Sequence, residues 1–418
     1  MRIAIIGSGV AGLTCAHLLS HEHDLTLFES DARAGGHAHT VSVLEGGTTL
    51  DVDTGFIVYN ERNYPLFTRI LCELGVASRP SEMSFAVADE DKGVEWSGSS
   101  LASVFAQPRN LARPAFLRML SDIVRFNRAA RELVHQPVDL EFSLADFLAT
   151  QRWSEGFLDW YLIPMGAAIW SCDPSVFTQF PAASFARFFD NHGLLGLGDR
   201  PEWRTIVGGS KRYVQAITAP LGERVRLGTS VTKVVRRRGS VEIATSDGAL
   251  EHFDHVIVAT HSNQALRVLA DPTAAEREVL GSIRYQRNVA TLHRDETLLP
   301  RHRRARASWN WHQGTARHAP TLTYDLSRLQ GLATSTPICL TLNRPEAVRD
   351  DLVLETMTYH HPVFDAPAMR SQLRRDEISD GDVSYVGAYW GYGFHEDGAR
   401  SAVEVCTKLG STWAKGGA

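Results

Sequence analysis

The first 29 residues constrain the fold of this chain more than any other stretch. A strand-like apolar run leads into Gly7-x-Gly9-x-x-Gly12, a helix-like segment follows, and a second apolar run ends at Glu29. Gly7 permits a tight turn, Gly9 lets the backbone approach a pyrophosphate, and Gly12 allows helix and strand to pack closely. The helix N-terminus would face phosphates with free N–H groups, and Glu29 stands where a ribose hydroxyl is bound. The stretch therefore predicts an α/β dinucleotide-binding domain.

Length and composition narrow the class of protein further. A chain of 418 residues exceeds the usual size of a single core, so two to three lobes are expected. The formal net charge of -5 argues against a nucleic-acid partner. The five cysteines are scattered without a C-x-x-C pair, which is typical of reduced thiols. With a strand beginning at Arg2 and no apolar run of spanning length, we expect a cytoplasmic protein.

The nucleotide-binding pattern is interrupted twice along the chain. Strand-like runs and glycine-bearing turns assign residues 1–80, 205–265 and 380–418 to the nucleotide domain, and residues 81–204 and 266–379 to a substrate domain.

Helical spacing of apolar residues predicts three helices in these segments. The first spans about Pro65 to Leu74 and is capped by Gly75, and the others cover 115–135 and 143–163. The last two helices belong to a mostly helical insertion.

Three blocks of sequence resemble the flavin-containing amine oxidase and phytoene-desaturase superfamily. The first is Glu29-x3-Arg33-x-Gly35-Gly36-His37, the second is Asp53-Thr-Gly55-Phe56, and the third runs from Tyr385 to Ala399. More narrowly, the chain is similar to bacterial predicted NAD/FAD-binding proteins of that superfamily, some of which are associated with modifying fatty acyl chains. The resemblance implies a Rossmann-like FAD-binding domain of the glutathione-reductase type, with a discontinuous α+β substrate domain that contains a helical insertion.

The resemblance also implies a set of FAD-binding residues in those blocks. Glu29 is expected at the adenosine ribose, Val231 near adenine, and the helix N-terminus after Gly393 at the flavin. The full set is Gly7, Ser8, Gly9, Ala11, Gly12, Glu29, Ser30, Arg33, Gly35, Gly36, His37, Thr54, Gly55, Phe56, Ile57, Val231, Gly387, Gly393, Phe394, His395, Glu396, Gly398 and Ala399.

Three departures from the superfamily pattern qualify these expectations. The loop ends in His37 where the superfamily has arginine, which leaves the pyrophosphate to backbone amides or Arg33. Thr291 stands where many amine oxidases carry a lysine near flavin N5, which argues against amine oxidation. No cysteine of the terminal segment is placed to bond the flavin, so non-covalent FAD is expected.

Aromatic and histidine residues are the catalytic candidates, because flavin itself accepts the hydride. We select His360, His361, Tyr389 and Tyr392, since imidazole moves protons near neutral pH. For each single histidine, His395 included, a packed or surface role is the simpler reading. The His360-His361 pair lacks further ligands at a recognisable spacing, so no metal site is expected.

Three stretches outside these motifs bear on the substrate. Aromatic residues crowd 153–189, as core or as the lining of an apolar tunnel. Residues 111–128 interleave apolar and arginine residues, as in a partly solvated domain helix or a helix on an anionic membrane. The arginine run at 301–306 is a solvated loop or a phosphate-binding segment.

Together these patterns predict an FAD-dependent oxidoreductase that oxidises or desaturates an apolar small molecule, such as a lipid acyl chain or an isoprenoid. Peripheral contact with the inner face of the membrane goes with this reading. The alternatives are a flavin amine oxidase, a non-catalytic or partner-binding flavoprotein, and an NAD-binding protein using the same motif. The sequence predicts neither the oligomeric state nor the electron acceptor.

Overall fold

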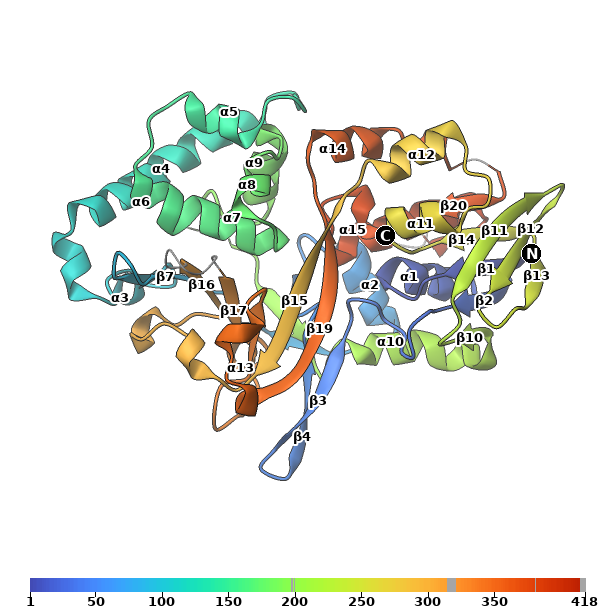
Figure 1. Cartoon of the computed structure of the whole chain (residues 1–418), viewed down its shortest axis with the longest axis horizontal. Coiled ribbons are helices and arrows are strands. Elements are labelled where there is room, and N and C mark those ends of the chain that lie inside the picture. The colour runs from blue at the N-terminus through green and yellow to red at the C-terminus, as the bar shows by residue number, and fades with distance from the viewer. Residues whose placement is uncertain (197, 199, 314–320, 380, 414–418) are drawn as a thin grey trace.

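The protein has two lobes that meet along long strands near its middle (Figure 1). A computed structural model describes all residues except 197, 199, 314–320, 380 and 414–418. One lobe contains both chain ends of the described part and a parallel sheet, and the other contains a large mixed sheet beneath a group of helices.

A five-stranded sheet with the order β10-β2-β1-β14-β20 forms the first lobe, and all its pairings are parallel. The strands are β1 (Arg2–Ile6), β2 (Asp24–Phe28), β10 (Val225–Arg226), β14 (His255–Val258) and β20 (Val383–Tyr385). Parallel sheets are buried on both faces, and these strands accordingly consist largely of buried aliphatic residues.

Different elements cover the two faces of this sheet. Because strand side chains alternate, Ile3 and Ile5 pack against helices on one face, whereas Ala4 and Ile6 pack against a second sheet on the other. The helices are α1 (Val10–Leu19), α2 (Pro65–Glu73), α10 (Lys211–Thr218) and α15 (His395–Lys408). The second face carries β11 (Val231–Arg237), β12 (Ser240–Thr245), β13 (Leu250–Phe253), α11 (Ser262–Val268) and α12 (Ala274–Gly281). This is the α/β nucleotide-binding architecture that the sequence predicts.

The second lobe is built on a seven-stranded sheet with the order β19-β15-β18-β17-β16-β7-β8. Its strands are β7 (Phe85–Asp89), β8 (Val94–Ser97), β15 (Tyr285–His293), β16 (Trp309–Gln313), β17 (Thr321–Asp325), β18 (Cys339–Leu342) and β19 (Val353–Pro362). Only the β16–β7 pairing is parallel. Two of the strands thus come from the insertion expected to be mostly helical.

Helices cover one face of this sheet. They are α3 (Leu101–Val104), α4 (Pro114–Val134), α5 (Leu144–Ala149), α6 (Glu155–Phe157), a π-helical turn η2 (Leu158–Leu162), α7 (Ile163–Trp170), α8 (Pro174–Phe177) and α9 (Ala182–Asn191). The single helix predicted over 143–163 is wrong, because the chain breaks after α5 and Ser154 caps a new helix. The aromatic residues of 153–189 are mostly core, since Phe157, Phe177 and Phe189 are fully buried.

Short elements join the lobes and complete the chain. The strands are β3 (Thr40–Glu45), β4 (Thr48–Asp53), β5 (Tyr59–Asn60), β6 (Ser78–Pro80) and β9 (Trp203–Ile206). The helices are α13 (Leu326–Leu329) and α14 (Ala366–Leu373), with short helical turns η1 (Pro108–Ala112), η3 (Ala219–Arg224), η4 (Glu296–Leu298), η5 (Arg303–Ala305), η6 (Pro345–Ala347), η7 (Asp350–Leu352), η8 (Arg375–Glu377) and η9 (Ala388–Trp390).

Two expectations about compartment can be compared with the structure. Within the part of the chain that is described, no helix combines the length and apolar character needed to cross a membrane. All five cysteines are free; four are buried and Cys72 is exposed.

Candidate nucleotide and substrate site

The three glycines of the first turn have three different surroundings. Gly7 has a φ of 101°, and a Cβ there would lie 2.9 Å from the carbonyl oxygen of Ala259. A Cβ on Gly12 would lie 1.9 Å from the carbonyl oxygen of Gly7, so helix and turn touch. A Cβ on Gly9 would meet nothing within 4 Å. Gly9 therefore faces open space, as backbone must where a ligand approaches it.

The N-terminus of α1 supplies hydrogen-bond donors beside that space. Gly9 is the N-cap residue, its helix has no side-chain cap, and no acidic residue stands in the first turn, which includes Ala11. The first N–H groups of a helix have no partner within the helix, and its dipole is positive at this end. An anion such as a pyrophosphate would be stabilised here.

Glu29 directly follows β2, and its carboxylate binds the glycine turn. Its Oε2 accepts hydrogen bonds from the N–H (2.9 Å) and hydroxyl (2.5 Å) of Ser8. Its Oε1 accepts from the hydroxyl of Ser30 (3.2 Å) and the N–H of Asp31 (3.0 Å). A carboxylate has about four lone-pair positions. A ribose hydroxyl would therefore replace one of the two serine hydroxyls.

Val231 marks the same end of the site. It begins β11 and packs with Phe28, the residue before Glu29, in one buried cluster.

The glycine-rich loop lies directly on the turn. The N–H of Gly35 donates to Ser8 O at 3.1 Å, and a Cβ on Gly36 would lie 3.1 Å from the Cα of Gly9. Both glycines have positive φ values, 119° and 57°. Arg33 donates to the carbonyl of Gly36 at 2.9 Å, so its guanidinium holds the loop. No described carboxylate forms an ion pair with Arg33, so its positive charge stays beside the loop.

The segment after β4 runs beside this loop. The N–H of Phe56 donates to the carbonyl of His37 at 2.8 Å, and a Cβ on Gly55 would lie 2.2 Å from the same oxygen. Thr54 Oγ1 lies 2.8 Å from Tyr359 Oη, and Ile57 packs at the edge of the second lobe's core.

The N-terminal end of α15 packs against the start of α1. A Cβ on Gly398 would lie 2.6 Å from Val10 Cγ1, and Ala399 is fully buried. Gly387 donates its N–H to Ser401 Oγ at 2.9 Å, and Gly393 has a φ of 90° that a side chain would strain. The structure thus brings the three sequence blocks together around the Gly9 turn.

The side chains of two residues in this last block have partners within the protein. Both oxygens of Glu396 accept N–H groups at the start of α2, from Leu66 (3.1 Å) and Phe67 (3.0 Å). The ring of His395 stacks on Phe56 with centroids 3.5 Å apart, and burial lowers its pKa well below the ordinary value. The Glu396 carboxylate thus caps a helix, and the His395 side chain is packed and neutral, as the simpler reading of a single histidine expects.

Histidines from three distant segments gather beside the glycine loop. The His37 ring lies 5.3 Å from His361, 6.0 Å from His261 and 5.1 Å from Tyr359. His39 Nδ1 lies 3.1 Å from Tyr359 Oη. We call these five residues the histidine cluster.

The histidine cluster is uncharged at neutral pH. Burial lowers the pKa of His37 and of His261 to about 3, and neighbouring imidazoles add to the effect. Burial also lowers the pKa of His39 and of His361 to about 4, and raises that of Tyr359 to about 12. Desolvation disfavours the charged form of each group.

A chain of amides fixes the tautomer of His361. The backbone N–H of Val289 donates to Asn343 Oδ1 (2.9 Å), so Asn343 Nδ2 must donate to Asn288 Oδ1 (2.7 Å). Asn288 Nδ2 then donates to His361 Nδ1, also at 2.7 Å. A neutral imidazole that accepts at Nδ1 carries its proton on Nε2. His361 is therefore a hydrogen-bond donor at Nε2 and not a free base there.

The other catalytic candidates lie apart from this cluster. His360 is exposed on β19, with its ring 6.4 Å from His261. Tyr392 packs on Phe188 of the helical region, with centroids 5.5 Å apart. Tyr389 is buried, and its hydroxyl has no hydrogen-bond partner among the described residues. The structure therefore places only His361 of the four candidates in the histidine cluster.

Three members of the cluster were not among the residues selected from the sequence: His39, His261 and Tyr359. His261 had a usable signal, because it follows the carboxyl end of β14 and ligands bind at the carboxyl ends of parallel strands.

Thr291 is buried with its hydroxyl unpartnered among the described residues. Across the described chain, no group of three His, Cys, Asp or Glu residues could hold a metal ion.

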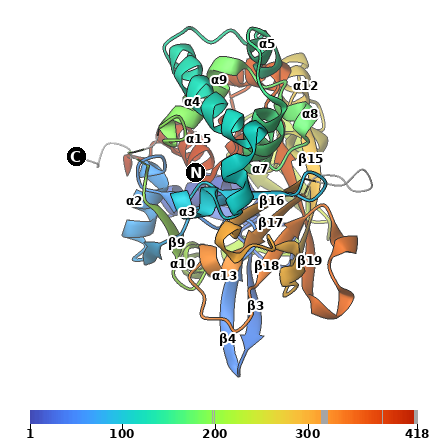
Figure 2. The ribbon, with the colours of Figure 1, turned by 90° about the vertical axis from the view of Figure 1, so that its left-hand side faces the viewer.

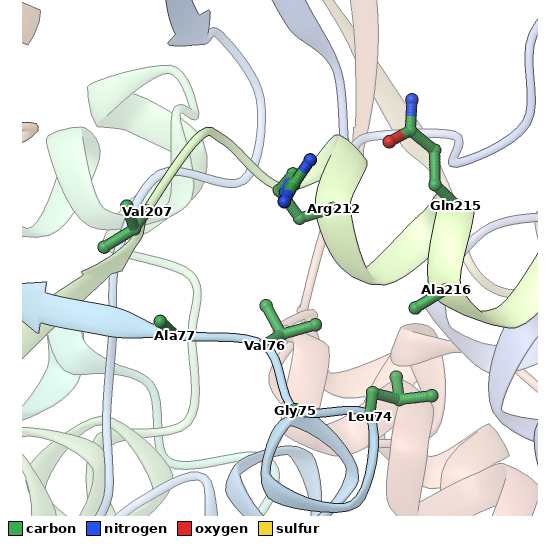
Figure 3. A pocket seen from close by; sticks show the side chains of 8 residues that line it. All are labelled: Leu74, Gly75, Val76, Ala77, Val207, Arg212, Gln215 and Ala216. Atoms are coloured by element: carbon green, nitrogen blue, oxygen red, sulfur yellow. The ribbon is translucent and has the colours of Figure 1, made fainter.

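A recess of about 450 Å³ lies elsewhere, between the end of α2 and the start of α10 (Figure 3). It is lined mainly by small aliphatic residues, and Arg212 is its one charged residue. It shares no residue with the glycine turn or the histidine cluster. We therefore assign the chemistry to the cluster and not to this recess.

Fold and site together define a dinucleotide-binding α/β protein with a second lobe on a mixed sheet. The chain belongs to the family of flavin containing amine oxidoreductases, whose model matches residues 10–293. That family is FAD-dependent, and the open space at Gly9, the uncapped helix and Glu29 fit the pyrophosphate and ribose of this cofactor.

Similar proteins include both amine and lipid enzymes. The Mycobacterium tuberculosis protein named flavin-containing monoamine oxidase AofH is 26% identical over 284 residues, which cover 65% of this chain and 59% of that protein. A variant of putrescine oxidase has a TM-score of 0.70 at 15% identity, covering 98% of this chain and 99% of its own. A CLA-producing fatty acid isomerase from P. acnes has a TM-score of 0.68 at 17% identity, covering 98% of each chain.

Proposed function

We propose that this protein is an FAD-dependent oxidoreductase that removes hydrogen from an uncharged, apolar substrate such as a lipid acyl chain or an isoprenoid. The observation that carries the proposal is the neutral histidine cluster beside the glycine loop. An ammonium substrate would gain no opposite charge from these side chains, whereas an uncharged substrate needs none.

In this proposal the residues of the site have separate roles. Bound FAD supplies the acceptor for a hydride from a substrate C–H bond. The first turn of α1 and Glu29 hold the cofactor, and Gly35 and Gly36 let the loop lie against it. His361 keeps its proton on Nε2 and stays neutral, and the stacked Phe56 and His395 exclude water from the same end. The second hydrogen leaves the substrate as a proton, which a neutral imidazole of the cluster such as His37 would accept.

Two further functions remain as alternatives. Amine oxidation is favoured by the names of two similar proteins, the monoamine oxidase and putrescine oxidase. Against it stands Thr291, which offers no amino group on β15. A non-catalytic flavoprotein would bind FAD, and no substrate would reduce the bound flavin.

Anaerobic incubation of the holoenzyme separates the three functions. We expect the oxidised flavin absorbance to fade with a total lipid extract, and the altered lipid to weigh two hydrogens less. Fading with amines alone would contradict the proposal in favour of amine oxidation. Persistence of the absorbance with lipids, carotenoids and amines would favour the non-catalytic reading.

A further inference from the structure

Four large apolar side chains are exposed at one end of the second lobe. They are Leu101 of α3 (80% exposed), Leu111 of η1 (58%), and Leu117 and Val124 of α4 (43% and 65%). Figure 2 looks onto the end of the molecule that carries α3 and α4. Exposed apolar side chains that gather at one end of a molecule are candidates for a surface that another phase or molecule covers.

The helix α4 has apolar residues on two faces, and its own lobe covers only one of them. Phe116, Met119 and Phe126 face the core and are fully buried. Leu117 and Val124 are seven residues apart, so they lie on one outward face, and Arg128 follows on the next turn. The domain-helix reading of this segment is therefore right for one face and leaves the other without a partner among the described residues.

Unpaired arginines surround these apolar side chains. Arg118 and Arg128 of α4, and Arg301, Arg303 and Arg304 in and before η5, make no side-chain hydrogen bond or ion pair within the described residues. A chain with a net charge of -5 thus gathers positive charge at one end. We call the exposed apolar side chains and these five arginines the arginine face.

Glu95 joins the two parts of the arginine face. Its carboxylate accepts the N–H groups of Arg301 (3.1 Å) and His302 (2.8 Å), while its own N–H donates to Gln107 beside η1. The turn η5 also contacts α3 and β8. The arginines of η5 are thus held next to the elements that expose Leu101 and Leu111.

The acids near this end are mostly engaged already. Glu95 also pairs with His302, and Lys92 binds Glu155 and Asp159. The turn between β7 and β8 adds two exposed acids, 90 and 91, which limit the excess of positive charge without cancelling it.

We propose that the arginine face docks the protein on an anionic lipid bilayer, with the leucines and Val124 inserted at the headgroup boundary. Positive side chains and apolar side chains on one surface match the two components of such a membrane. A nucleic acid or an acidic protein would match the arginines but not the four apolar side chains. The proposal goes beyond the proposed function, since it holds for any substrate of the flavin site.

Vesicle flotation of the FAD-loaded protein tests this docking. We expect binding to vesicles of phosphatidylcholine with about 30% phosphatidylglycerol, weak binding to phosphatidylcholine alone, and release at high salt. Arg303→Ser with Arg304→Ser should lower the partition coefficient by about ten-fold or more. Leu117→Ser with Val124→Ser should lower it at every salt concentration.

A matched control comes from the opposite end of the molecule. Arg238→Ser with Leu250→Ser removes an exposed arginine that has no side-chain partner among the described residues and a leucine that is 66% exposed, both near the β11–β13 sheet. We expect full vesicle binding from this control, and an unchanged flavin spectrum from every variant. Equal binding by all variants, or none by the wild type, would overturn the docking proposal. Turnover of detergent-dispersed substrate reports on the flavin site separately.

Discussion

Asn343 controls the chemistry of His361 although the two side chains do not touch. It adopts a φ of 58°, which is uncommon outside glycine, and the β15 backbone orients its amide through Val289. The orientation passes through Asn288 to the imidazole. Asparagine is among the side chains that adopt this left-handed conformation most readily, so the backbone and the amide direction of Asn343 are compatible.

Asn288→Asp tests this chain of amides. The carboxylate can still accept from Asn343 but cannot donate to His361 Nδ1, so the imidazole must gain a proton there. We expect the pKa of His361 to rise from about 4 toward its ordinary value, because an opposite charge favours the protonated form. NMR titration of the histidine side chains measures it. With Asn127→Asp on α4 as control, an unchanged His361 titration would refute the tautomer assignment.

Gly9 and Gly12 form a matched pair for the cofactor site. Gly9→Ala adds a methyl group to open space, so the apoprotein should lose only about 1 kcal/mol as its N-cap changes, while FAD affinity falls ten-fold or more. Gly12→Ala places the same group against Gly7 O and should cost about 1–3 kcal/mol or more of unfolding free energy. Denaturant unfolding of apoprotein and FAD titration separate the effects. Equal FAD affinity of Gly9→Ala and wild type would contradict the assignment.

At the scale of elements, the sequence predicted the parts whose pattern is local. The β1-α1-β2 unit, the α2 helix with Gly75 at a φ of 63°, and α4 follow from glycine turns and apolar periodicity. The break within 143–163 was missed although Thr150 to Arg152 interrupt the apolar pattern and Ser154-Glu155 is a helix-start signal. The pairing of β7 with β16 joins segments more than 200 residues apart, and no local signal encodes such a contact.

The candidate site divides in the same way. Its glycines were predictable, since their positive φ values and close contacts follow from fixed spacing. The histidine cluster was not, because His37 meets His361 only through the placement of β19 beside the loop after β2. His360 and His361 are adjacent in sequence but point to different surroundings, as neighbours on a strand must.

Glu396 couples α15 to α2 and predicts a pH-dependent stability effect. Its carboxylate accepts two N–H groups at the α2 N-terminus, where negative charge is favourable. Burial raises its pKa to about 6. Ionisation of this buried carboxyl therefore costs stability as the pH rises through about 6, so Glu396→Gln should lower the unfolding free energy by about 1 kcal/mol at pH 5, where the wild-type group is largely protonated, and by less at pH 8. Thermal melts at both pH values measure this difference, and an equal loss at both would contradict the raised pKa of Glu396.

At the scale of the whole molecule, buried neutral histidines make the fold sensitive to acid. His37, His261 and His361 have pKa values of about 3 to 4 in the folded protein and ordinary values when unfolded. Between about pH 6.5 and pH 4 the unfolded chain therefore binds protons that the native chain does not. Asp53, whose pKa burial raises to about 6, acts in the opposite direction, as does Glu396.

We expect the melting temperature to fall as the pH is lowered from 7 to 5, because the histidines outnumber these two acids. His261→Asn should make the fall shallower, since it removes one proton-binding group of the unfolded chain. His360→Asn, at an exposed position next to the cluster, serves as control. Scanning calorimetry across this range provides the measurement. A melting temperature that stays level or rises toward pH 5 would show that the histidines are charged in the folded protein.

The two lobes meet where the glycine turn, the histidine cluster and the start of α15 lie together. We expect one FAD to bind along these three parts of the site. Denaturing the purified protein and identifying the released chromophore tests it most directly. The account predicts one FAD per chain, released without covalent attachment, and a Gly9→Ala protein that retains much less. Release of a nicotinamide nucleotide, or a folded protein with no affinity for FAD, would contradict it.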